Sequence, residues 1–196
     1  MTEWVTIASV VEGHGDVAAL PLLIRRVAIE CYGCYDVLVP KPHRVPRTQM
    51  VRGDFLQRAV TMQSMRITER GGVLVVADAD DDCPVELART LAEFAGSEVV
   101  VAVANREFEG WFLAGIESLR EHRAVKDDAV YVEDPDAKRA AKEELTRLMH
   151  EPYNEPLHQP AFASLVSIEE ASRRSRSFRH FVDAVGRLIN GSEVSG

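Results

Sequence analysis

The stretch WVTIASVVEGHGDVAAL, residues 4–20, holds the change between structural elements that decides the fold. Residues 4–11 form an almost continuous apolar and β-branched run, which is typical of a buried parallel strand. Two glycines follow, and apolar residues then recur at helical spacing over residues 17–29. A strand, a glycine turn and a helix in this order predict the first unit of an α/β protein.

The same alternation continues along the chain. Further strands are predicted at residues 35–39, 72–77 and 98–104, and further helices at residues 54–70, 84–95 and 106–121. A basic, proline-rich loop follows the second strand and runs through Arg52. Short apolar strands that alternate with helices predict a four-stranded parallel sheet with helices on both of its faces.

Strand signals are weak in the C-terminal tail, residues 123–196. Helices are predicted there near residues 136–150 and 178–189, with a proline-containing loop through Pro160 between them. We therefore predict an α/β domain over residues 1–122 and a helical extension, the tail, packed on it.

Composition limits the classes of function. Hydrophobic residues make up 46% and charged residues 28% of the 196 residues, as in soluble globular proteins. No apolar stretch reaches the roughly 20 residues of a membrane span, and no signal-peptide pattern opens the sequence. Three cysteines are too few for a disulfide framework. We expect a cytoplasmic protein that has no membrane partner.

The net charge of −8 argues against a protein that coats nucleic acid through overall basic charge. It still allows an enzyme that meets nucleic acid through a metal ion and a local basic strip. Basic residues cluster in segments 41–52 and 173–180. If both segments flank the site, nucleic acid is favoured as the substrate, whereas segments on the far face would be irrelevant.

Acidic residues follow three of the four predicted strands. They are Glu12 and Asp16 after the first strand, Asp78, Asp80 and Asp82 after the third, and Glu107 and Glu109 after the fourth. The C-terminal ends of parallel strands meet at one sheet edge, where ligands bind. Two carboxylates about 4 Å apart repel by roughly 4 kcal/mol at an effective dielectric constant of 20, so the cluster needs a cation or protons. Oxygen ligands favour Mg²⁺ or Mn²⁺ over zinc.

The glycine turn has a second interpretation, because residues 13–18 also satisfy the G-x-G-x-x-G/A fingerprint of a dinucleotide-binding turn. A pyrophosphate at the helix N-terminus would meet the negative charges of Glu12 and Asp16. The acidic residue expected at the end of the second strand is also missing, because residues 39–41 are Val-Pro-Lys. The dinucleotide interpretation therefore fails two independent tests.

Some of the acidic residues have structural alternatives. Asp82 precedes a proline in a first helical turn and is either a ligand or a helix cap. Asp78 and Asp80 project the same way if the strand continues past them. The side chains of Glu107 and Glu109 would point apart on a helix but could converge at a strand-to-helix junction. A purely structural explanation is equally good, because acidic residues in the first turn of a helix interact favourably with the helix dipole.

Two motifs carry a resemblance to a known family. Glu12-Gly13-His14-Gly15-Asp16 and Asp78-Ala79-Asp80-Asp81-Asp82 resemble the TOPRIM domain of topoisomerases, DnaG-type primases and overcoming-lysogenization-defect nucleases, over about residues 4–115. The chain is more closely similar to a group of uncharacterised TOPRIM-like bacterial proteins. The shared features are Glu12–Arg26, Glu107–Ala114, Lys142, Tyr153, His158-Gln159-Pro160 and Ser177-Phe178. Asp16 departs from that group, which often has glutamate there.

The resemblance implies a set of roles. Glu12, Asp78 and Asp80 would be the core ligands of one or two divalent cations. Asp16, Asp82, Glu107 and Glu109 would complete a second site. Paired ions about 3.5 to 4 Å apart activate a water and stabilise the leaving oxygen of a phosphodiester. Lys142 would neutralise the transition state, unless it is a solvent-facing helix lysine near Glu143 and Glu144.

The leading hypothesis is a Mg²⁺-dependent TOPRIM-type nuclease or phosphodiesterase that acts on nucleic acid, in a phage-defence context that only the resemblance suggests. The alternative is a non-catalytic TOPRIM-like module that binds a metal or a nucleotide and works with a partner protein such as an ATPase. A third hypothesis is an enzyme that transfers phosphate on a small molecule at the same acidic site.

Overall fold

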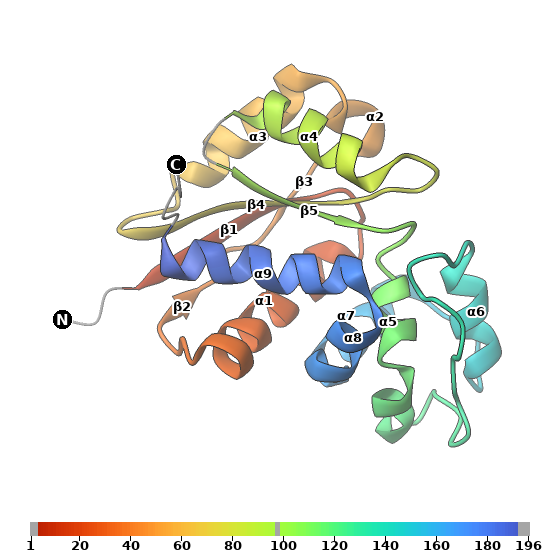
Figure 1. The fold of residues 1–196 in the computed structure, drawn as a ribbon. Helices are drawn as coiled ribbons and strands as arrows, with labels where there is room; N and C mark the ends of the chain where they lie inside the picture. The colour runs from red at the N-terminus through yellow and green to blue at the C-terminus, as the bar shows by residue number, and fades with distance from the viewer. Residues whose placement is uncertain (1–3, 97–98, 192–196) are drawn as a thin grey trace.

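A computed structural model describes residues 4–96 and 99–191, and a parallel β-sheet lies at its centre (Figure 1). Its strands are β1 (Val5–Val11), β2 (Val37–Leu38), β3 (His43–Arg44), β4 (Arg70–Asp78) and β5 (Val99–Ala104). The order across the sheet is β2-β1-β4-β5, and β3 pairs with the end of β1. Every one of these pairings is parallel, which confirms the predicted fold class.

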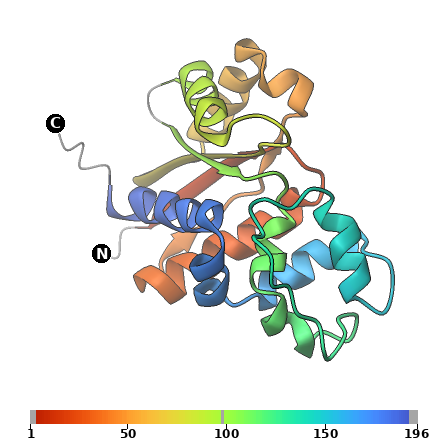
Figure 2. The same cartoon turned by 45° about the vertical axis from the view of Figure 1, so that its right-hand side comes forward.

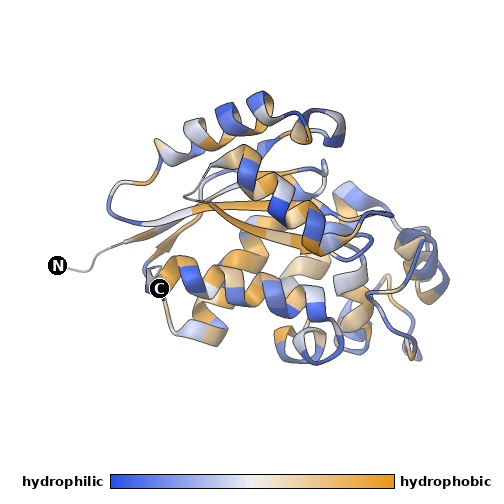
Figure 3. Cartoon of the chain, turned by 45° about the horizontal axis from the view of Figure 1, so that its top comes forward, coloured by the Kyte–Doolittle hydropathy of each residue, from blue (hydrophilic) through white to orange (hydrophobic). Residues whose placement is uncertain are grey.

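Helices cover both faces of the sheet (Figure 1). The helices on one face are α2 (Arg47–Met50), α3 (Gly53–Ser64) and α4 (Pro84–Ala95), and those on the other are α1 (Asp16–Tyr32) and α9 (Arg176–Asn190). All seven side chains of β1 are buried, because the sheet is covered on both sides. Figure 3 shows strands of mostly hydrophobic residues between helices in which hydrophobic and hydrophilic residues alternate.

The tail covers part of the sheet as well as forming a helical extension. Its last helix, α9, contacts β1, β4 and β5, and the buried Phe181 and Leu188 belong to the same hydrophobic core as Ile7 of β1. The helix therefore covers one face of the sheet together with α1. The division of the chain after residue 122 stays a prediction.

The remaining helices gather beside the C-terminal edge of the sheet (Figure 2). They are α5 (Gly110–Ala114), the 3-10 helix η1 (Ile116–Glu121), α6 (Ala141–Leu148), α7 (Glu155–Leu165) and α8 (Ile168–Arg174). Helix α7 lies against α1, so residues far apart in sequence meet there. No helix among the described residues is both long and apolar enough to be a candidate membrane span.

Several predicted elements differ from the structure. The loop predicted through Pro160 is wrong, because α7 includes this proline and is capped by the Asn154 side chain, which accepts from the amide of Leu157. The predicted helix 106–121 is interrupted at Gly115. The basic loop contains β3 and α2. Helix α3 ends at Ser64, six residues before its predicted end at 70, where β4 begins. Residue 98, predicted to begin the last strand, lies outside the described residues.

Gly71 lies in β4 opposite Thr6 of β1, at a position where a side chain would collide with the main chain of β1. Its φ is +116°, and an added Cβ would lie 1.9 Å from the carbonyl oxygen of Thr6. We expect Gly71→Ala to reduce the free energy of unfolding by at least about 2 kcal/mol, through backbone strain and overlap with a main-chain atom. Urea denaturation followed by circular dichroism measures this loss.

Gly33→Ala is the matched control for this substitution. Gly33 also has a positive φ, +61°, but an added Cβ would meet no atom within 4 Å. We expect a loss of about 1 kcal/mol there, from the left-handed conformation alone. Equal losses at the two positions would show that the contact with Thr6 has no effect.

Candidate functional site

A cleft of about 370 Å³ opens at the C-terminal edge of the sheet. We call it the acidic cleft. It is lined by Glu12, Gly13, His14 and Asp16 after β1, Arg44, Pro46 and Arg47 of the basic loop, Asp78 at the end of β4, Glu109 before α5, and Lys142, Glu155 and Gln159 of the tail. Parallel strands thus bring the ends of β1 and β4 and the segment after β5 to one place, together with two elements of the tail.

Asp78 lines this cleft from the end of β4 and is half-buried. Its Oδ1 accepts a hydrogen bond of 2.9 Å from the main-chain N–H of Phe108. Burial raises the pKa of Asp78 well above its ordinary value, and the negative charges of Asp16, Glu109, Glu12 and Asp80 raise it further. The ionised form of Asp78 is therefore costly unless a positive charge approaches it.

Arg47, from the basic loop, brings a positive charge to the neighbouring Glu12. Its Nη1 lies 3.5 Å from Oε2 of Glu12 and donates a 2.7 Å hydrogen bond to the carbonyl oxygen of Asp78. Its Nη2 pairs with the carboxylate of Asp82. Burial raises the pKa of Glu12, and Arg47 partly offsets that rise. Arg47 thus ties the ends of β1 and β4 together.

The turn from Glu12 to Asp16 is closed by its own aspartate. Oδ2 of Asp16 accepts from the N–H of Gly13 at 2.9 Å, and Oδ1 accepts from Nε2 of Gln159 at 2.8 Å. The N–H of Gly15 donates to Oε1 of Glu155 at 2.8 Å. Carboxylates therefore already accept from the backbone donors that a phosphate would need, in agreement with the rejection of the dinucleotide interpretation.

Glu109 and Lys142 form a second charged group in the cleft. Glu109 is 1% exposed, and its Oε1 lies 3.2 Å from the hydroxyl of Tyr153 and 3.7 Å from Nζ of Lys142. Burial raises the pKa of Glu109 to about 7, against the opposing effect of Lys142. Burial lowers the pKa of Lys142, but Glu109 and Glu155 raise it above its ordinary value, and Nζ lies 2.7 Å from Glu155. Lys142 therefore stays protonated at neutral pH.

Asp80 and Glu107 line a neighbouring hollow of about 190 Å³ instead of the acidic cleft. Strand β4 ends at Asp78, and Asp80 has a left-handed backbone with φ +49°, so the alternation expected from a continuing strand does not apply. Oε1 of Glu107 accepts from the N–H of Ala141 at 3.4 Å. Asp80 still raises the pKa of Glu12 and Asp78, so the two hollows are electrostatically coupled.

The structure thus groups Glu12, Asp16, Asp78, Glu109 and Lys142, and separates the other predicted ligands from them. Asp82 is exposed, pairs with Arg47 and caps no helix, because the N-cap of α4 is Cys83. Glu109 lines the acidic cleft and Glu107 the neighbouring hollow, so the two carboxylates do not share one site.

The atoms that line the cleft are of the chemical type that a hard cation prefers, but they are not arranged to bind one in this structure. Among the described residues, no three histidine, cysteine or acidic side chains are placed to hold an ion as they stand. The acidic side chains that line the cleft nonetheless offer oxygen donors, and Oε1 of Gln159 is buried beside Gly15 without a hydrogen-bond partner. A buried orphan oxygen beside crowded carboxylates fits Mg²⁺ or Mn²⁺ in chemical type, and the side chains would have to turn toward the ion.

The two basic segments have different surroundings. Arg44 and Arg47 of the first segment line the acidic cleft. Arg176 and His180 of the second line a groove between α4 and α9, and Arg173 lines another hollow. The condition that both segments flank the site is therefore not met, because the first segment alone borders the acidic cleft.

Sequence reasoning assigned no site role to Arg47, Tyr153, Glu155 or Gln159. Glu155 and Gln159 lie four residues apart, on one face of α7. Asn154 followed by Glu-Pro is a helix-start signal that would have placed them on that face. Arg47 carries no comparable local signal, because its role depends on β3 bringing the basic loop beside β1.

The sequence and the structure were compared with those of known proteins and protein families. No curated protein matches the sequence. A solved structure, the C-terminal region of the OLD protein of Xanthomonas campestris pv. campestris, is similar at 12% identity with a TM-score of 0.45, over 94% of this chain and 97% of that one. A family model described as a domain of unknown function, DUF4276, matches residues 11–186. Because that match spans most of the sequence, the chain belongs to the DUF4276 family.

Proposed function

We propose that this protein is a Mg²⁺- or Mn²⁺-dependent phosphodiesterase of the TOPRIM type that cleaves nucleic acid. The observation that carries the proposal is the crowding of carboxylates in one cleft around the half-buried Asp78, whose pKa is raised by desolvation and by Asp16, Glu109 and Glu12. An enzyme keeps such repulsion where a cation or a transition state relieves it. Arg44, Arg47 and Lys142 border the same cleft and suit a polyanionic substrate.

Each residue has a distinct part in this mechanism. Glu12 and Asp78 would hold the cation, with Asp80 reaching in from the neighbouring hollow. The bound ion would lower the pKa of a water and polarise the phosphoryl oxygen. Lys142, protonated at neutral pH, offsets the negative charge that develops on the phosphate. Asp16 shapes the turn through Gly13 and Gln159.

Glu109 is the candidate for proton transfer in this cleft. A carboxyl with a pKa of about 7 exchanges a proton efficiently near neutral pH. The Tyr153 hydroxyl, 3.2 Å away, fixes its orientation. In this mechanism Glu109 would therefore transfer a proton instead of binding the metal ion.

The alternative function is a non-catalytic module that binds a metal or nucleotide and works with a partner protein. The arrangement that favours it is the contact of Arg47 with Glu12 and of Lys142 with Glu109, because these pairs already neutralise part of the carboxylate charge. A phage-defence setting would suit either function.

Cleavage of labelled DNA and RNA with Mg²⁺, Mn²⁺ or EDTA tests the proposal. We expect cleavage with either metal ion and none with EDTA. Glu12→Gln should reduce the rate about 100-fold and weaken Mg²⁺ binding in calorimetry, and Lys142→Met should reduce the rate about 100-fold while Mg²⁺ binding persists. Binding of Mg²⁺ without cleavage of any substrate would favour the non-catalytic module.

Lys138→Met is the matched control for Lys142→Met. Lys138 lies four residues earlier, and its Nζ pairs with Glu144 at 2.8 Å outside the acidic cleft. Cleavage should stay within about twofold of the wild-type rate. A similar loss in both variants would mean that Lys142 acts through the stability of α6 instead of through the substrate.

A further inference from the structure

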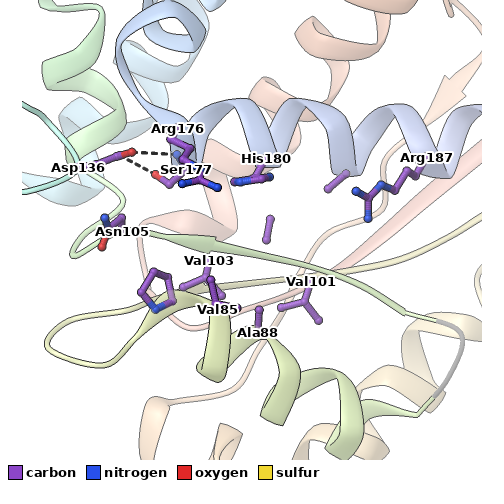
Figure 4. Close-up of a pocket in the computed structure, with 13 residues that line it drawn as sticks. Val85, Ala88, Val101, Val103, Asn105, Asp136, Arg176, Ser177, His180 and Arg187 are labelled. Atoms are coloured by element: carbon purple, nitrogen blue, oxygen red, sulfur yellow. Dashed lines mark hydrogen bonds between the residues drawn. The ribbon is translucent and has the colours of Figure 1, made fainter.

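A groove of about 320 Å³ lies along β5, the last strand in the order of the sheet, between α4 and α9 (Figure 4). The carbonyl oxygen of Ala104 accepts a 2.9 Å hydrogen bond from the N–H of Ala79, so the polar main-chain groups of Ala104 face β4. Neighbouring residues of a strand direct these groups to opposite sides, so those of Val101 and Val103 face outward. In the described part of the chain, no strand pairs with this side of β5.

The α4 wall of this groove is apolar. It is formed by Pro84, Val85 and Ala88, and the side chains of Val101 and Val103 pack on the same face of the sheet (Figure 4). Val85 is 67% exposed, which is a large apolar exposure for a residue beside an open strand edge. A side chain from an added strand would bury this valine.

The α9 wall of the groove is basic, and its two arginines carry positive charge. Arg176, His180 and Arg187 lie along it at positions that share one stripe of the helix (Figure 4). Within the described residues, these three side chains form no ion pair. The acidic Asp136 lies at one end of the groove, where its carboxylate accepts from Ser175 Oγ at 2.7 Å and from Ser177 N at 3.0 Å and Oγ at 2.8 Å.

We propose that the β5 edge binds an extended segment of a partner protein in which apolar and acidic residues alternate. Successive side chains of an added strand point to opposite faces, so one set would meet the valines beside α4 and the other the cations of α9. Arg176 and Arg187 are separated by about 16 Å along the helix, a length that about five strand residues span. Backbone pairing would supply affinity, and the two walls would supply selectivity.

A second copy of this chain is a poorer occupant of the groove. Pairing of two β5 edges about a twofold axis would place the α9 cations of one copy beside those of the other. Nucleic acid would satisfy the cations, but it would leave the outward N–H groups of β5 and the exposed Val85 without partners. An acidic strand satisfies all three features.

Hydrogen exchange of the Val101 and Val103 amides, measured by NMR, tests this proposal. The probe is a synthetic peptide of about seven residues that alternates valine and glutamate, with a valine–lysine peptide as its control. We expect the glutamate peptide to slow exchange at both amides at least about fivefold, and the lysine peptide to have no effect. The double variant Arg176→Glu/Arg187→Glu should reverse this preference, and both positions are exposed, so the fold should persist.

Four results would overturn the proposal: no protection by the glutamate peptide, equal protection by both peptides, protection of the same amides by a single-stranded oligonucleotide, or protection without peptide in a self-associated protein. The proposal goes beyond the proposed nuclease function and does not depend on it. Asp78→Asn should leave peptide binding unchanged, so failure of one proposal is distinguishable from failure of the other.

Discussion

Asp78→Asn is expected to reduce metal-dependent cleavage about 1000-fold, the size of effect that removal of one preorganised charge has in an active site. Asparagine has nearly the same shape and still accepts from the N–H of Phe108, so the strand end should keep its conformation. The negative charge that would attract a divalent cation is lost. Steady-state cleavage of a labelled substrate at saturating Mg²⁺ measures the effect.

The same substitution should stabilise the metal-free protein. Burial and four neighbouring carboxylates oppose ionisation of Asp78, and asparagine removes that conflict. Each kcal/mol recovered should raise the Tm by about 2 to 4 °C in a chain of this size. Asp81→Asn is the control, because Asp81 is exposed and pairs with Arg106 and Arg139 outside the acidic cleft. Unchanged cleavage, or a lower Tm, in Asp78→Asn would contradict the proposed role.

Without metal, the protein should lose stability as pH rises from about 4.5 to above 7. Glu109 has its pKa raised to about 7, so the folded state holds a proton that the unfolded chain has already released across this window. Its contribution is fully present below the unfolded pKa of 4.5 and is lost as pH rises through 7, by about 3 kcal/mol. Urea denaturation at a series of pH values measures the change.

Glu109→Gln isolates this contribution from those of other groups. Glu155, whose pKa is lowered, acts in the opposite direction, so the difference between variant and wild type is the informative quantity. The variant should have a shallower fall in stability above pH 5. Parallel pH profiles for the two proteins would rule out Glu109 as the titrating group.

Mg²⁺ should reverse the loss at high pH if the cleft binds it. At pH 8, a concentration about 100 times the Kd would raise the free energy of unfolding of wild type by about 2.7 kcal/mol. Asp78→Asn should gain much less from the same addition. An equal gain in both proteins would place the ion elsewhere.

The fold was largely predictable because buried parallel strands are long apolar runs. Residues 5–11 and 72–77 are such runs, and both are buried in the sheet. Helix α7 was missed because Pro160 is a helix breaker in isolation, and packing against α1 overrides that local preference. The two-residue strand β3 depends on its pairing with β1 and has no periodicity of its own.

The site residues that follow the ends of strands could be predicted from the sequence, and those that the tail contributes could not. Glu12 and Asp78 follow from the rule that parallel strands end at one edge. Asp80 was grouped with them because alternation was extended past residue 78, where the strand stops. The places of Glu155 and Gln159 follow from the approach of α7 to α1, a contact between distant segments that no local pattern encodes.

The turn after β1 is completed by residues of α7, which lie far from it in the sequence. Gly15 bonds to Glu155 across 140 positions, and Asp16 to Gln159 across 143. When only the strands of the sheet have emerged from the ribosome, the cleft is therefore incomplete. Contacts between such distant segments form late in folding. An enzyme built in this way would stay inert while it is being synthesised, and a protease cut before α7 would leave a fragment with the acids but without the groups that organise them.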